Sequence, residues 1–149
     1  MYFTNYLLHA FLDNTIRSPY LANHTLPDSG ATMRFSDWVQ FHKIRENVPA
    51  AAGLFQIKTC EGLLQYPRGR SSMYYYGYAK QLNEDLLRFR NEILKMLEVD
   101  EKELRVRWMV AADTVERFQK HLDRFYAQFG SLPMGNELFL RKKASGNLL

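Results

Sequence analysis

Two stretches decide the fold: GLFQIK at residues 53–58 and MYYYGY at residues 73–78. Both are short, rich in aromatic and branched side chains, and bounded by turn-forming residues, which is typical of β-strands. Between them, residues 59–62 have the composition of a turn, and residues 63–66 run back as a short strand until Pro67 breaks it. Residues 68–72 (RGRSS) are expected to form a basic loop. The centre of the chain therefore predicts two or three antiparallel strands.

The segments that follow alternate between helical and strand periodicity. Apolar residues recur at spacings of three and four over residues 80–97 and again over residues 114–129, which predicts two helices with one core-facing side each. Between them, residues 104–111 alternate, so that Arg105 and Arg107 lie on one face of a strand. The pattern predicts an α/β fold of the α+β type, in which helices flank a small, mainly antiparallel, three-stranded sheet.

The N-terminal third is predicted to be accessory. Residues 1–12 have the spacing of an amphipathic helix that docks on the core or on a protein partner, and residues 15–32 have the composition of a loop. Ser36 is placed to cap a short helix that buries Trp38, Phe41 and Ile44. We divide the chain into accessory elements (1–47), a core (48–137) and a basic tail (138–149), which is expected to be frayed over residues 141–149.

Composition narrows the class of protein. A chain of 149 residues with 46% hydrophobic content predicts one folded domain. Its formal charge of +4 is compatible with nucleic acid but does not require it. The single Cys60 excludes an internal disulfide framework, and the apolar start is too short to span a bilayer, so we expect a cytoplasmic protein without membrane contact. P-loop, zinc-finger, nucleophile-elbow and dinucleotide-binding motifs are absent from the sequence.

The order of these features over residues 48–137 resembles the core of the GIY-YIG nucleases. Gly53-Leu54-Phe55 and Tyr75-Tyr76-Gly77 stand where that family has its two name-giving triplets on paired strands. The resemblance implies an endonuclease that cleaves DNA phosphodiester bonds with Mg²⁺ or Mn²⁺, in which Glu116 holds the metal, Tyr75 positions water and Asn136 supports the site. One divalent metal can stabilise both the charge on phosphate and the leaving oxygen.

Two departures from the family pattern affect catalysis. Phe55 stands at the first tyrosine and has no hydroxyl to orient a water. Asp85 stands about where the family has an arginine that grips phosphate, and an anion there would repel the substrate. Arg88, nearly one turn later, and Lys80 at the helix start are the candidate substitutes. We therefore expect weak or absent cleavage.

Each site residue also has a simpler interpretation. The tyrosines of residues 74–76 can pack on the sheet, Asp113 and Glu116 have the spacing of a helix cap, and Asn136 beside Gly135 is a common turn residue. The candidate nucleic-acid contacts can instead be a solvated surface balanced by acidic neighbours; they are Arg68, Arg70, Lys80, Arg105, Arg107 and the basic residues 141–143.

Three functions follow from these interpretations. The leading one is a degenerate nuclease relative that binds nucleic acid, most simply DNA. The alternatives are an active metal-dependent endonuclease, and a non-catalytic subunit that binds a protein partner through the N-terminal helix.

Overall fold

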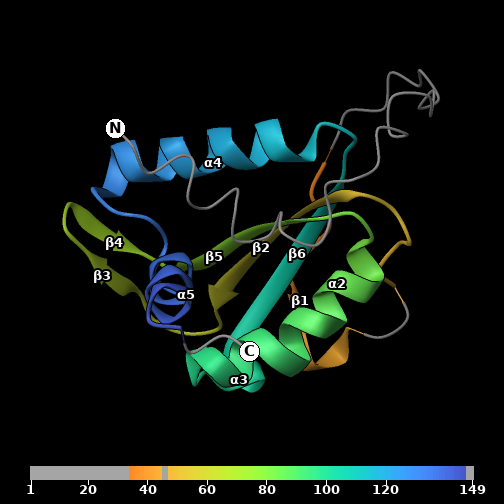
Figure 1. Cartoon of the computed structure of the whole chain (residues 1–149), viewed down its shortest axis with the longest axis horizontal. Coiled ribbons are helices and arrows are strands. Elements are labelled where there is room, and N and C mark those ends of the chain that lie inside the picture. Colours follow the sequence, from red (N-terminus) through yellow and green to blue (C-terminus); the bar gives the residue numbers. More distant parts are fainter. Residues whose placement is uncertain (1–33, 45–46, 147–149) are drawn as a thin grey trace.

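A computed structural model describes residues 34–44 and 47–146, so the helix and loop expected over residues 1–32 lie outside the described residues. Its main sheet has four antiparallel strands in the order β1-β6-β2-β5: Val39–Gln40, Leu104–Val110, Gly53–Thr59 and Met73–Ala79 (Figure 1). A separate hairpin joins β3 (Leu64–Tyr66) to β4 (Gly69–Ser71). The α+β class is confirmed, and the three strands predicted from periodicity are neighbours in one sheet.

Helices cover both faces of this sheet. On one face, α2 (Leu82–Arg88), a π-helical turn η3 (Phe89–Ile93) and α3 (Leu94–Leu97) follow one another without a break. On the other face lies α4 (Thr114–Phe129), and α5 (Met134–Ala144) packs beside β5 (Figure 1). Short 3₁₀ turns, η2 (Phe41–Lys43) and η4 (Glu101–Glu103), complete the described elements.

The register of the sheet sorts the side chains into two rows. Phe55 of β2 is opposite Gly77 of β5 and Trp108 of β6. The next residue, Gln56, is opposite Tyr76 and Arg107, and because successive side chains of a strand alternate, this second row faces the other way. Two apolar clusters result, one with Phe55, Tyr75 and Phe89 under α2 to α3, and one with Leu54, Phe118 and Leu122 under α4.

The predicted helix at Ser36 is wrong, and the sheet has four strands rather than three. The Ser36 backbone N–H donates to the carbonyl of Trp108 at 2.7 Å, and its Oγ accepts from the Trp108 N–H at 3.1 Å. The segment therefore runs along β6 as an edge strand. Of the predicted helix, only the single 3₁₀ turn η2 forms.

The basic loop predicted at residues 68–72 is also wrong, because most of it is strand β4. The Arg68 backbone N–H donates to the carbonyl of Phe129 at 3.0 Å, and its Nη2 donates to that of Tyr126 at 3.1 Å. The hairpin turn thus binds the last carbonyls of α4, where a cation is favourable. Arg70 is exposed on the same hairpin.

The C-terminal tail is helical over most of its length. Helix α5 continues to Ala144, so the prediction of a frayed end from residue 141 is wrong for its first four residues. Asn136 accordingly lies inside a helix and not in a turn. No helix in the described part of the chain is long and apolar enough to cross a membrane.

Candidate functional site

Phe55 and Tyr75, the aromatic residues at the two triplet positions of the family resemblance, lie in the hydrophobic core. Tyr75 is 0% exposed, and its ring stacks on Phe55 with centroids 6.0 Å apart and planes 17° apart. Phe89 of the π-helical turn packs on both, 4.6 Å from Tyr75 and 5.6 Å from Phe55. A Cβ at Gly77 would lie 2.1 Å from the Phe55 ring, so this glycine makes room for it. The space beside Phe55 and Tyr75, where the resemblance places the catalytic water, is therefore filled by packed side chains.

The Tyr75 hydroxyl has no hydrogen-bond partner among the described residues. Burial, followed by the neighbouring Tyr78 and Tyr74, raises its pKa well above the usual 10.0. It is therefore a neutral phenol at physiological pH, and it is not exposed to a substrate or its water.

Glu116 lies on the far side of the sheet from Tyr75. It lies in the first turn of α4, its side chain is 68% exposed, and it pairs with Lys120 at 3.0 Å. Asp113 does not cap the helix with its side chain; it binds Arg117 at 2.7 Å. In the described part of the chain, no three His, Cys, Asp or Glu side chains are grouped as metal ligands. These residues do not fit a Mg²⁺ or Mn²⁺ centre acting beside Tyr75.

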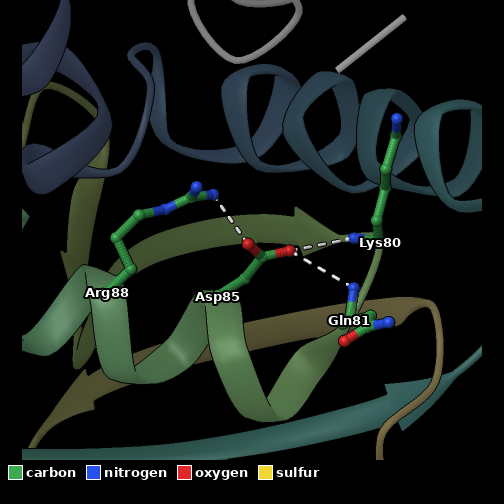
Figure 2. Close-up of polar contacts among 4 residues, drawn as sticks. All are labelled: Lys80, Gln81, Asp85 and Arg88. Carbon is green, nitrogen blue, oxygen red and sulfur yellow. Dashed lines mark hydrogen bonds and ion pairs between the residues drawn. The ribbon is translucent and has the colours of Figure 1, made fainter. Parts of the chain in front are cut away.

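Asp85 stabilises the start of α2 (Figure 2). One carboxylate oxygen accepts from the backbone N–H groups of Lys80 at 3.0 Å and Gln81 at 3.3 Å. The other accepts from Arg88 Nη2 at 2.6 Å. The acid thus binds the two backbone N–H groups that immediately precede α2, and it pairs with the arginine that was the candidate phosphate ligand. The Lys80 side chain takes no part in this arrangement (Figure 2).

Asn136 holds the edge of the sheet at Tyr76. Its Oδ1 accepts from the Tyr76 N–H and its Nδ2 donates to the Tyr76 carbonyl, both at 2.9 Å. The side chain is 0% exposed, and β5 is an edge strand, so the amide replaces a missing strand neighbour. Asn136 is therefore brought to Tyr76, the neighbour of the tyrosine that the resemblance selects.

A cavity of about 350 Å³ lies on the α4 face. Its lining residues come from β2, β5, β6, α4 and the segment before β1; they are Phe35, Gln56, Met73, Tyr76, Arg107, His121, Arg124, Phe125, Gln128 and Phe129. The described lining includes two arginines, one histidine and four aromatic rings, without an Asp or Glu. This cavity, which we call the α4 cavity, is basic and aromatic.

Arg107 is held in place at this cavity. Its Nε and Nη2 both donate to Gln56 Oε1, at 2.9 and 2.7 Å, and Gln56 is only 6% exposed. The guanidinium also lies 4.5 Å from the ring centres of Phe35 and Trp38. A neutral amide anchors the cation and leaves its charge uncompensated, unlike a carboxylate.

His121 completes the polar group. Its Nδ1 lies 3.4 Å from Gln56 Nε2. Burial, and then the charges of Arg124, Arg117 and Arg107, lower its pKa below the usual 6.5. His121 is thus neutral near pH 7, and each cause except burial is a nearby arginine. Burial also raises the pKa of Tyr76 to about 12, so its hydroxyl keeps its proton.

The positive charge continues along the sheet beyond the cavity. Lys58 is directly opposite Arg105, and like charges in that relation are destabilising. Lys58 Nζ lies 4.5 Å from the Trp38 ring, and the Arg105 Nε is buried without a hydrogen-bond partner in the described part of the chain. We call this surface, formed by Lys58, Arg105, Arg107 and Arg124 together with the neutral His121, the basic groove.

Four residues of this site were not predicted from the sequence: Gln56, Lys58, His121 and Arg124. The available signal was a row on one flank of α4 at helical spacing, comprising Arg117, His121, Arg124 and Gln128. Of the sequence candidates, Arg105 and Arg107 lie in the basic groove. Tyr75, Phe55, Glu116 and Arg88 do not.

Comparisons with protein-family models, curated proteins and solved structures found no match to this chain.

Proposed function

We propose that this protein binds nucleic acid through the basic groove and is a catalytically silent relative of the GIY-YIG nucleases. The observation that carries the proposal is the α4 cavity, where Arg107 is fixed by a neutral glutamine and no described lining residue is acidic. An immobilised guanidinium without a carboxylate partner can bind a backbone phosphate, and the aromatic rings beside it can stack with the base of the same nucleotide.

Two further features support phosphate binding along this face. Arg124 has no carboxylate partner among the described residues and is exposed at the cavity. The opposed pair of Lys58 and Arg105 would be relieved by an anion between or beside them. Arg117 contributes less, because Asp113 already neutralises it.

Catalysis is not expected, because the residues at the family's catalytic positions do not converge on one site. Cleavage would need Tyr75 to reach water and Glu116 to hold a metal beside it. Tyr75 is instead in the core, and Glu116 lies on the other side of the sheet, where it pairs with Lys120 of the same helix. Asp85 and Arg88 form an ion pair where the family binds phosphate. Loss of charge stabilisation is usually the largest loss a catalytic site can suffer.

The test is a titration of labelled DNA and RNA at several salt concentrations, followed by fluorescence anisotropy. Affinity should fall steeply with salt, and Arg124→Ala should reduce the slope of log K against log salt by about 0.7–0.9, the value for one phosphate contact. The double variant Arg105→Ala/Arg107→Ala should flatten it further.

The matched control is Arg88→Ala, because Arg88 is an exposed arginine on the opposite side of the sheet. An equal loss in Arg88→Ala and Arg124→Ala would remove the groove from the proposal. In a parallel assay with Mg²⁺ or Mn²⁺, strong cleavage abolished by Glu116→Ala would establish the active nuclease instead. Salt-independent behaviour, with no binding to any nucleic acid, would favour the protein-partner function.

A further inference from the structure

We infer that the α4 cavity receives one unstacked base of a single-stranded nucleic acid, so that the protein prefers single strands to duplex. This inference rests on the proposed function and names its substrate class. It concerns which part of the nucleic acid enters the cavity, whereas the function concerns only the charged surface around it.

The volume of the cavity suits a small group such as a base. Its volume of about 350 Å³ falls in the range of small-ligand pockets. The cavity lies between a helix and a sheet. A paired base within a duplex is stacked on both faces, so only the backbone of a duplex could approach such a recess. An unpaired base exposes both faces and can be inserted.

The walls offer aromatic surface. Phe35, Tyr76, Phe125 and Phe129 all line the cavity. Phe125 packs edge-on against Tyr76 and tilted against Phe129, whereas Phe35 is tilted against His121. Tyr76 meets Phe125 at 85° with centroids 5.6 Å apart, so the two rings present surfaces in different directions. In proteins that bind single-stranded nucleic acid, the bases stack on aromatic rings, and this stacking requires no particular base sequence.

The polar lining offers both donors and acceptors. The nitrogen of Gln56 donates toward the Nδ1 of His121, which leaves the Nε2–H of that histidine as a donor. Gln128 adds a side-chain amide of its own. Base edges also carry both donors and acceptors, whereas a bare phosphate offers acceptors alone and would leave the acceptors of this set unused.

The cations are arranged for the phosphates next to such a base. Arg107 is fixed on the sheet side of the cavity, and the exposed Arg124 is on the helix side. Beyond the cavity, Arg105 and Lys58 continue the positive charge along β6 and β2. A strand can therefore place a base in the recess while its backbone follows the groove.

The experiment uses the full chain and three labelled probes with the same number of phosphates: a short oligothymidine, the same backbone without bases, and a duplex. Removing the stacked base should weaken binding about 5- to 150-fold. The duplex should bind at least about tenfold more weakly than the single strand, at one fixed salt concentration. Thymidine monophosphate is added as a competitor.

A variant pair tests the cavity itself. Gln128→Trp places a large side chain at a residue that lines the cavity, without changing charge, and should weaken oligothymidine at least about fivefold. Ala127→Trp adds the same ring at the neighbouring exposed position, which does not line the cavity, and should leave binding unchanged. Circular dichroism verifies that both variants fold.

The outcomes separate the two claims. Equal affinity for single strand, abasic backbone and duplex would overturn the base site but leave the proposed function standing. Unchanged or tighter binding in Gln128→Trp would also overturn it. Competition by the monophosphate at the same concentration as the oligomer would assign the cavity to a free nucleotide and refute the single-strand preference. No binding to any probe would refute both claims.

Discussion

Removing the Tyr75 hydroxyl should stabilise this protein, whereas it would disable a nuclease that used Tyr75. The substitution Tyr75→Phe keeps the ring that stacks on Phe55 and packs on Phe89. It deletes an oxygen that is buried and has no hydrogen-bond partner among the described residues. Its effect on unfolding therefore measures whether that hydroxyl has a structural or chemical role.

The magnitude follows from two opposing terms. A buried hydroxyl without a partner loses its hydrogen bonds to water, at a cost of about 1–3 kcal/mol. Deleting it forfeits a few dispersion contacts of about 0.1–0.2 kcal/mol each. The free energy of unfolding should therefore rise by about 1 kcal/mol. For a domain of this size, that corresponds to an increase of about 2–4 °C in Tm.

Urea denaturation followed by fluorescence provides the measurement, and Tyr66→Phe provides the control with the opposite sign. The Tyr66 hydroxyl donates to the Met73 carbonyl at 2.6 Å and accepts from the Met134 N–H at 3.1 Å. Its removal leaves two backbone groups without their partner and should cost about 1–3 kcal/mol for each. The same chemical change is thus expected to stabilise at one tyrosine and destabilise at the other.

A loss of stability in Tyr75→Phe, comparable to that in Tyr66→Phe, would refute the reasoning, because it would mean that the Tyr75 hydroxyl is hydrogen-bonded. A loss of metal-dependent cleavage without loss of stability would refute it differently, since it would give the phenol a role in chemistry. Binding of nucleic acid should be unchanged, because Tyr75 faces away from the basic groove.

Three further predictions follow. Asn136→Ala should lower the free energy of unfolding by about 1–3 kcal/mol for each of the two Tyr76 backbone groups it leaves unpaired, measured by urea denaturation. Asp85→Ala should cost about 1 kcal/mol in the same assay, as loss of a helix-terminal acceptor does, so Asp85→Arg should destabilise α2 rather than restore a phosphate site. The lowered pKa of His121 means that the unfolded state takes up its proton first, so stability should fall as pH drops below 6.5, and His121→Gln should flatten that dependence between pH 7.5 and 5.5.

The elements that sequence reasoning found are those whose stability is local or periodic. Helix α4 runs over the predicted residues 114–129, because an unbroken apolar stripe ends at Gly130, which adopts a left-handed conformation. The three long strands were also found, since alternation and aromatic content are visible in one sequence.

The missed elements depend on partners far away in the chain. β1 has two residues, and the segment before it is bound to β6 through Ser36 and Trp108, which are separated by 72 positions. Helix α5 has no continuous apolar stripe; Asn136 ties it to Tyr76, and Gly135 packs against the Tyr74 ring. Neither relation leaves a signal in the local sequence.

The site was missed for a related reason. A resemblance directed attention to Tyr75 and Glu116, but their positions along the chain do not state on which side of the sheet each one lies. Gln56 gave no signal, because a buried glutamine acquires meaning only when β6 places Arg107 opposite it. Arg105 and Arg107 were found because alternation alone predicts that they share a face.

The glycine that carries the family resemblance also decides which tyrosine is accessible. Gly77 is opposite Phe55, and a Cβ there would meet the Phe55 ring at 2.1 Å. A slip of β5 by one residue would bring Tyr76 or Tyr78 opposite Phe55 and force that collision, while moving every side chain of the strand to the other face. The Phe55–Gly77 pairing therefore favours one register. In that register Tyr75 enters the apolar core and Tyr76 lines the α4 cavity. The triplet that resembles the family motif thus directs Tyr75 inward and leaves Tyr76 at the α4 cavity.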